Sequence, residues 1–116
     1  MRYMVTVNMR EDVGAPPVEL NEAMGREMGE AFASGVMVDA GVLAPTARST
    51  ELRVAGGRLS VTDGPYAEAR EVVGGYSIVQ ADSDEQAVTL ARRVAEIHQE
   101  FWPEWQGSVE VRAISG

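Results

Sequence analysis

Two stretches of apolar residues at helical spacing, set among short alternating stretches, constrain what this chain can fold into. In the first, residues 18–39, apolar side chains recur every three or four positions, beginning with Leu20 and Met24. This spacing is typical of an amphipathic helix. We therefore predict a helix over 18–39 that starts after Pro17 and stops at Gly41.

The second stretch carries the signals of a capped helix. Ser83 precedes it, and Gln86 three residues later completes a capping-box pattern, in which each side chain binds the backbone of the other residue. Its apolar stripe runs from Ala87 to Phe101, and Pro103 prevents much continuation. We predict a helix that begins after Ser83 and ends before Pro103.

Around these helices, polar and apolar residues alternate, which indicates half-buried strands. The alternation is found in residues 3–8, 50–55, 58–62, 75–80 and 108–114. The second and third of these strands flank Gly56-Gly57, a two-residue turn of the primed type that joins antiparallel strands. We predict a hairpin there, followed by a loop over 63–73.

The predicted order is strand, helix, hairpin, strand, helix and strand, which points to an α+β fold. It is close to the ferredoxin-like pattern, an α/β sandwich with an antiparallel sheet. With 116 residues the chain has room for a single domain, residues 1–116. The helices would cover one face of the sheet, while the other face also carries apolar side chains. Either that face is half-polar and solvated, or a second copy covers it in a dimer.

Composition excludes several kinds of chemistry. The net charge of -8 repels phosphate backbones and anionic lipids, so we expect neither nucleic-acid nor membrane binding. All ten basic residues are arginine and there is no cysteine, which excludes lysine Schiff bases and thiolate nucleophiles. The single histidine cannot build a histidine-rich metal site, and we expect no metal or other cofactor. No basic segment followed by an apolar one opens the chain, so we expect a cytoplasmic location.

The segment 63–76, DGPYAEAREVVGGY, resembles the signature of the YCII-related family in its DGPF branch. Tyr66 stands where the branch has phenylalanine. Shorter matches are found in MRYMV at 1–5, AGVL at 40–43 and VEVR at 109–112, so the resemblance covers nearly the whole chain. The loop that follows AGVL is shorter here than in many relatives, so a ligand contact from that loop is not carried over.

The resemblance implies a dimeric α+β barrel, in which two ferredoxin-like subunits form a homodimer by pairing their sheet faces. Related barrels include small enzymes such as muconolactone isomerase-like proteins, and a His–Asp pair has been proposed as an acid–base site within the family. The DGPF branch brings no established reaction. Some relatives are joined to sigma-factor regulators of transcription, which allows a regulatory role.

Asp63 and His98 are the candidate catalytic residues. Asp63 opens Asp-Gly-Pro, which is good turn chemistry but can also hold a carboxylate at a pocket rim as general acid or base. His98, close to Trp102 and Trp105 in the sequence, is either a partly exposed residue at the negative end of a helix dipole or a proton carrier near Asp63. The sequence leaves open whether the two side chains meet.

Five residues are candidates for substrate binding, each with a simpler alternative. A phenol or an amide can hydrogen-bond a ligand, and a guanidinium can grip a carboxylate with two donors. In the simpler alternatives, Tyr66 fills the loop as an aromatic plug, Arg48 and Arg53 pair with acids on a strand face, and Asn8 caps the first strand. The candidates are Tyr66, Arg48, Arg53, Tyr76 and Asn8.

Two functions stay open. The first is a small-molecule enzyme of lyase or isomerase type that uses Asp63 as acid–base, with His98 or Tyr66 assisting. The second is a non-catalytic dimeric module that binds a ligand or regulates transcription through a protein partner. A pocket with convergent acid–base groups favours the first function, and a pocket without them favours the second.

Overall fold

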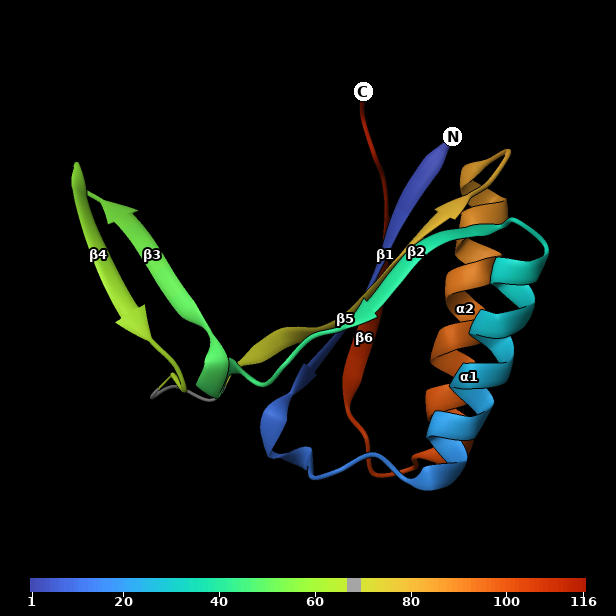
Figure 1. The fold of residues 1–116 in the computed structure, drawn as a ribbon, viewed down its shortest axis with the longest axis horizontal. Helices are drawn as coiled ribbons and strands as arrows, with labels where there is room; N and C mark the ends of the chain where they lie inside the picture. Colours follow the sequence, from blue (N-terminus) through green and yellow to red (C-terminus); the bar gives the residue numbers. More distant parts are fainter. Residues whose placement is uncertain (67–69) are drawn as a thin grey trace.

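Helices lie on one face of an antiparallel sheet, and a hairpin projects from the other side (Figure 1). The computed structural model describes residues 1–66 and 70–116. Within these residues the strands are β1 (Arg2–Arg10), β2 (Met37–Val42), β3 (Thr50–Ala55), β4 (Arg58–Asp63), β5 (Glu71–Gln80) and β6 (Gly107–Ala113). The α-helices are α1 (Val18–Ala33) and α2 (Asp84–Phe101), and short 3-10 turns are η1 (Glu11–Val13) and η2 (Thr46–Arg48). The predicted α+β class is confirmed.

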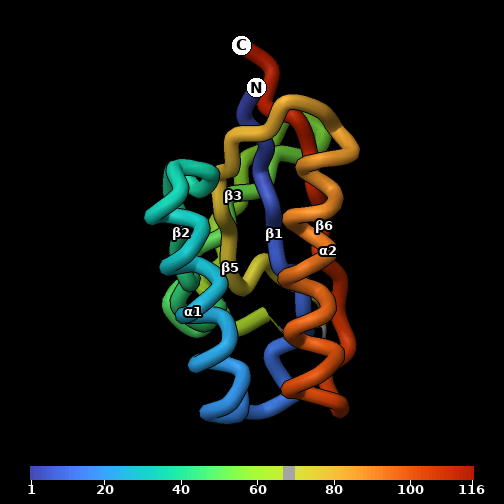
Figure 2. Tube along the Cα trace, turned by 90° about the vertical axis from the view of Figure 1, so that its right-hand side faces the viewer, coloured from blue at the N-terminus to red at the C-terminus, as the bar shows by residue number. Residues whose placement is uncertain are grey.

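The main sheet has the strand order β2-β5-β1-β6, with antiparallel pairing between neighbours. This is the ferredoxin-like order, so that part of the prediction is confirmed as well. Seen from the helix side in Figure 2, α1 lies over the β2 side of the sheet and α2 over the β6 side. β1 pairs with a neighbouring strand along both of its edges, so its position in the sheet is fixed. The segment that follows its C-terminal end contacts the base of the hairpin.

The helix predicted over 18–39 is wrong in its last part, since α1 ends at Ala33. Ser34 caps it, and Gly35 follows with φ of 80°, a conformation that glycine adopts without strain and that ends a helix. The next residues form β2, and Gly41, the predicted helix stop, lies inside this strand. The helical spacing of apolar residues continues past Ala33 by coincidence. Residues 37–42 form a strand because they pair with β5.

The predicted hairpin is confirmed, with β3 and β4 joined at Gly56-Gly57. Both glycines have positive φ, 58° and 73°, as a primed two-residue turn requires. The hairpin does not join the main sheet but stands apart from it, on the side opposite α1 and α2 (Figures 1 and 2). The strand predicted at 75–80 is longer than expected, because β5 begins at Glu71.

The core lies between the helices and the main sheet. One cluster centres on Tyr3 and Val5 of β1, which pack with Ala87 and Ala91 of α2. A second cluster, toward the C-terminal end of α2, surrounds the fully buried Ile97. Burying a large apolar side chain contributes about 1.5–3 kcal/mol to folding. Burial therefore fixes α1 and α2 to one face of the sheet.

α2 begins as predicted. The Ser83 hydroxyl accepts a hydrogen bond of 3.1 Å from the Gln86 backbone N–H, which confirms Ser83 as the N-cap. The Gln86 side chain reaches back and accepts a bond of 2.6 Å from the Asp82 N–H. A capping box would use the N–H of the cap residue itself, so the reciprocal bond is shifted by one position.

The face of the main sheet turned away from the helices, here called the open face, has an apolar centre. Side chains alternate along a strand, and Tyr3 beside it is buried in the core, so Met4 points to the open face. Met4 pairs with Ile78, and Thr6 pairs with Tyr76, which gathers four side chains into one patch. Two predictions remain open for this patch. Either it is exposed to solvent, or a second copy of the chain covers it in a dimer.

Candidate functional site

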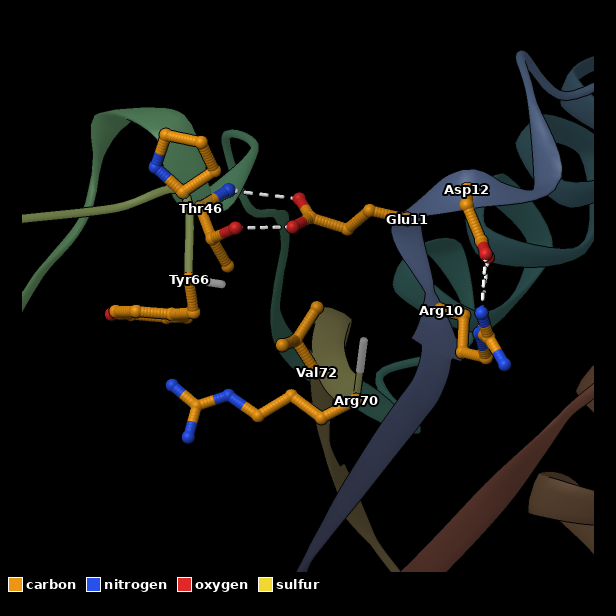
Figure 3. A pocket seen from close by; sticks show the side chains of 8 residues that line it. Arg10, Glu11, Asp12, Thr46, Tyr66, Arg70 and Val72 are labelled. Carbon is orange, nitrogen blue, oxygen red and sulfur yellow. Dashed lines mark hydrogen bonds and ion pairs between the residues drawn. The ribbon is translucent and has the colours of Figure 1, made fainter. Parts of the chain in front are cut away.

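A cleft of about 300 Å³ lies where the base of the hairpin meets the C-terminal end of β1 (Figure 3). Its walls come from the end of β1 and η1, from η2, and from the segment that leads from β4 into β5. The lining residues are Arg10, Glu11, Asp12, Thr46, Pro65, Tyr66, Arg70 and Val72. Four of them, Pro65, Tyr66, Arg70 and Val72, belong to the signature segment 63–76.

One carboxylate holds two walls of the cleft together. The backbone N–H of Thr46 donates a 2.8 Å hydrogen bond to Glu11 Oε2, and the Thr46 hydroxyl donates to Glu11 Oε1. Figure 3 shows the Glu11 side chain extended toward Thr46. Both oxygens of Glu11 are therefore used to tie η1 to η2, two segments that lie 35 residues apart.

Gly64 brings two backbone segments into close contact at the same place. Its N–H donates a 2.9 Å hydrogen bond to the Ser49 carbonyl. A Cβ at this position would lie 1.7 Å from the Thr46 carbonyl oxygen, so every other residue type is excluded without movement of the backbone. The glycine of Asp-Gly-Pro thus has a structural role at the base of the hairpin. The peptide bond from Gly64 to Pro65 is cis.

Tyr66 is fixed at both its hydroxyl and its ring. The Ser49 hydroxyl donates its one hydrogen to the Thr46 carbonyl at 2.8 Å, so the Tyr66 hydroxyl is the donor in its 2.8 Å contact with Ser49 Oγ. The Arg70 guanidinium carbon lies 4.0 Å from the centre of the Tyr66 ring, a cation–π arrangement. One nitrogen of Arg70 also contacts Glu51 Oε2 at 3.0 Å.

The cleft has a balanced set of charges. Arg10 pairs with Asp12, with its Nε 3.1 Å from Asp12 Oδ1. Arg70 pairs with Glu51 of β3, and Glu11 is held by Thr46. The side chains of these ion pairs are between 35% and 60% exposed, so each pair contributes only about 0–1 kcal/mol to stability. The guanidinium groups can therefore exchange partners at small cost.

Asp63 lies outside the lining of this cleft. It is the last residue of β4 and is exposed, and its Oδ1 accepts a 3.0 Å hydrogen bond from the Thr50 hydroxyl directly across the hairpin. Arg48 of η2 and Arg53 of β3 are also exposed and are not among the lining residues. Of the predicted residues near the hairpin, the structure brings Tyr66 to the cleft and leaves these three outside it.

His98 is buried on the helix side of the molecule. Its Nδ1 donates a 2.9 Å hydrogen bond to the Val94 carbonyl one turn earlier in α2, and its ring lies 4.5 Å from the Trp105 ring at a tilt of 42°. The hairpin that ends in Asp63 projects on the opposite side of the sheet (Figure 1). Within one chain, Asp63 and His98 are thus held on different parts of the fold, and His98 is more buried than predicted.

Tyr76 and Asn8 lie on the open face rather than at the cleft. The Tyr76 hydroxyl donates a 3.5 Å hydrogen bond to Asp39 Oδ2. The Asn8 side-chain amide donates to the hydroxyls of Thr6 at 3.3 Å and Ser108 at 3.4 Å. Their polar groups are therefore engaged with other side chains of the same sheet.

Of the cleft residues, sequence reasoning named Tyr66 as a candidate and missed the others, which are Pro65, Arg70 and Val72 of the signature segment and Arg10, Glu11, Asp12 and Thr46 outside it. Thr46 carried no local signal, because its partner Glu11 is distant in the chain. A basic residue at the end of the first strand, followed directly by two acids, was a weak signal of a polar loop.

A second hollow of about 590 Å³ lies beside the C-terminal end of α2. Trp102, Trp105, Arg92 and Glu96 contribute to its walls, and it contains no residue of the signature segment. The Trp105 indole N–H nearby is buried without a hydrogen-bond partner among the described residues. This hollow shares no side chain with the cleft at the hairpin.

Two further findings concern the part of the chain that the structure describes. In residues 1–66 and 70–116, no cluster of three or more histidine or acidic side chains is placed to hold a metal ion. No helix in these same residues is both long and apolar enough to cross a bilayer.

The fold and the cleft define a small ferredoxin-like α+β protein with a hairpin inserted between the second and third strands of its sheet. The model of the YCII-related domain matches residues 1–115, so the chain belongs to the YCII-related family. This confirms the family predicted from the signature segment, while the finer placement in the DGPF branch stays a prediction. No curated protein matches the chain.

Proposed function

We propose that this protein is a binding module for a small organic carboxylate, which occupies the cleft at the base of the hairpin. The observation that carries the proposal is the position of Arg70, whose guanidinium lies over the Tyr66 ring in the wall of that cleft. A guanidinium has five N–H donors in a planar fork that matches a carboxylate. Within the described part of the chain, its contact with Glu51 involves one nitrogen, which leaves other donors for a ligand.

The size of the cleft suits a small ligand. About 300 Å³ is at the lower limit of pockets that bind small molecules. Val72, Pro65 and the Tyr66 ring supply apolar wall, and Arg10 supplies a second guanidinium. A ligand with one or two carboxylates and a short carbon skeleton fits this combination of size and charge.

The acids of the cleft support binding more than acid–base catalysis. Both oxygens of Glu11 accept hydrogen bonds from Thr46, and Asp12 is paired with Arg10. A general base needs an oxygen within hydrogen-bond reach of the proton that it removes. Asp63 and His98 hold their hydrogen bonds elsewhere in the fold.

A second candidate is a lyase or isomerase, and one observation favours it. The Tyr66 ring lies in the cleft wall, and its hydroxyl, which donates to Ser49 Oγ, becomes a proton donor to a ligand when it exchanges that partner. On this hypothesis Tyr66 replaces the predicted Asp63–His98 pair, or Asp63 reaches the ligand after the hairpin base moves. The Tyr66→Phe variant separates the two functions, since a binding module keeps its affinity and an enzyme loses turnover.

The proposed assembly is a homodimer that pairs the open faces of two sheets. The patch formed by Met4, Thr6, Tyr76 and Ile78 supports it, because no helix of the same chain covers this apolar centre in the described structure. Two sheets packed face to face lie about 10 Å apart, which such side chains fill.

Calorimetric titration tests the binding proposal, with acetate, succinate and benzoate as probes. We expect saturable binding of at least one probe to the wild type and a loss of affinity of about tenfold or more in Arg70→Gln. Arg93→Gln is the matched control, because Arg93 also pairs with a glutamate, Glu27, but on the helix surface. Equal affinity in the wild type and Arg70→Gln, or no saturable binding of any probe, would overturn the proposal.

A further inference from the structure

The projecting hairpin, here called the arm (residues 50–63), has one face made of large apolar side chains. Leu52 lies directly opposite Val61, and Val54 lies directly opposite Leu59. Cross-strand partners point to the same face of a hairpin, so the four side chains form one continuous patch. Each of them is between 62% and 73% exposed.

The other face of the arm is polar, so the pattern is amphipathic. Arg53 pairs with Ser60, and Glu51 pairs with Thr62. An alternation of this kind is typical of a strand with one buried face. A hairpin on its own is at best marginally stable in water, and large contiguous apolar patches on a protein surface mark interaction sites. We therefore expect another surface to pack against the apolar face of the arm.

Among residues 1–66 and 70–116, no other part of the chain packs over the apolar face of the arm. The arm stands away from the main sheet (Figure 1), and the radius of gyration is 15.8 Å. A compact chain of this length has a radius of gyration of about 13 Å. The excess reflects the extended arm, whose apolar side chains lie in neither of the core clusters.

We infer that the apolar face of the arm packs against a second copy of this chain, as part of the interface that also covers the open face. The arm projects on the same side of the molecule as the open face (Figures 1 and 2), so a single partner that approaches this side meets both surfaces. In a two-fold dimer the same surfaces contact each other twice, and both copies are covered at once.

The arm enlarges the surface that a second copy can cover. The open face has a small apolar centre, and beside it on β6 the partners of Met4 and Thr6 are the charged residues Arg112 and Glu110. The arm adds four large apolar side chains to that centre. A stable interface buries about 800 Å² per partner, so a larger apolar surface favours a dimer.

The charge distribution favours a second copy as the occupant. Glu51 and Asp63 balance Arg53 and Arg58, so the arm has no net charge, although the chain carries -8. Two acidic copies repel each other wherever their bodies approach. A neutral arm with an apolar face gives like-charged copies a place to touch without that repulsion.

Sedimentation equilibrium of two adjacent variants tests the inference. Leu59→Glu places a charge on the apolar face of the arm, and Ser60→Glu places the same charge on the polar face of the same strand. We expect a wild-type dimer, a dissociation constant raised about tenfold or more in Leu59→Glu, and a wild-type value in Ser60→Glu. Equal dissociation constants for the two variants would overturn the inference, and so would a monomeric wild type at tens of micromolar.

A spin label gives a second readout that does not depend on a destabilising substitution. The chain has no cysteine, so Val54→Cys carries a single label on the apolar face of the arm. The label should lose mobility as the protein concentration passes through the dimer range. A label that stays mobile across that range overturns the inference and leaves a different protein as the occupant of the arm.

The variant Met4→Glu, on the open face, separates this inference from the proposed sheet-paired dimer. If Met4→Glu dissociates the dimer while Leu59→Glu does not, the sheet pairing stands and the role of the arm fails. The calorimetric titration of the cleft is independent of both, since neither residue lines it.

Discussion

The Tyr3 hydroxyl donates a 2.6 Å hydrogen bond to Asp84 Oδ1, which joins the first strand to the first turn of α2. This hydrogen bond, with burial and the negative charge of Asp84 adding to it, raises the pKa of the Tyr3 phenol above its ordinary value of 10.0. The folded state therefore holds this proton more tightly than the unfolded state. The bond stabilises the protein below the unfolded pKa, and its contribution is lost as the pH rises through the raised pKa.

The Tyr3→Phe variant tests this relationship. We expect it to be less stable than the wild type at pH 8, and the difference should shrink as the pH rises above about 10. The chain has no lysine, so no ammonium side chain adds its own titration in that range. Urea denaturation of both proteins at several pH values measures the difference. Tyr76→Phe serves as the control, and a stability difference for Tyr3→Phe that does not change with pH would contradict the prediction.

The Gly64→Ala variant should disturb the base of the hairpin. The new methyl group would meet the Thr46 carbonyl, so the segments that carry Tyr66 and Thr46 must move apart. We expect a loss of about 1–3 kcal/mol in the free energy of unfolding and weaker binding in the cleft. Thermal denaturation and calorimetric titration measure the two effects.

Gly25→Ala is the matched control for that substitution. A Cβ at Gly25, inside α1, meets no atom within 4 Å, and alanine is a better helix former than glycine by up to about 1 kcal/mol. This variant should be as stable as the wild type or more stable. A Gly64→Ala protein that matches it would show that the hairpin base is not packed as described.

Ser83→Ala should lower stability by about 1 kcal/mol, because it removes the acceptor for the Gln86 N–H at the start of α2. Chemical denaturation measures the change. Ser60→Ala, on the exposed arm, is the control and should lie within about 0.5 kcal/mol of the wild type. Equal effects at the two serines would argue against a cap at Ser83.

Asp63→Asn should leave both stability and ligand affinity close to the wild type. Asparagine keeps an oxygen that accepts the hydrogen bond from Thr50 but cannot act as a base. The stability change should lie within about 0.5 kcal/mol. A large loss of affinity or of turnover in Asp63→Asn would restore Asp63 as a functional residue and contradict the binding module proposed for the cleft.

The sequence determined the elements that depend on neighbouring residues. The turn at Gly56-Gly57 and the cap at Ser83 are built from contacts within four residues, and both were predictable. The signature segment was also readable, and with it the family. The strand β2 was not, since residues 37–42 continue the apolar spacing of α1 and become a strand through pairing with β5.

Only the tertiary structure decided the composition of the cleft and the place of the arm. The contact of Glu11 with Thr46 closes a long loop, and the requirement for glycine at position 64 comes from a carbonyl 18 residues earlier. Local sequence signals carry no information about such contacts. In the same way, alternation predicted that β3 and β4 form a hairpin with one apolar face, but only the fold shows that this face is directed away from the protein's own core. Periodicity defines which side chains share a face, and the packing of distant segments decides what that face meets.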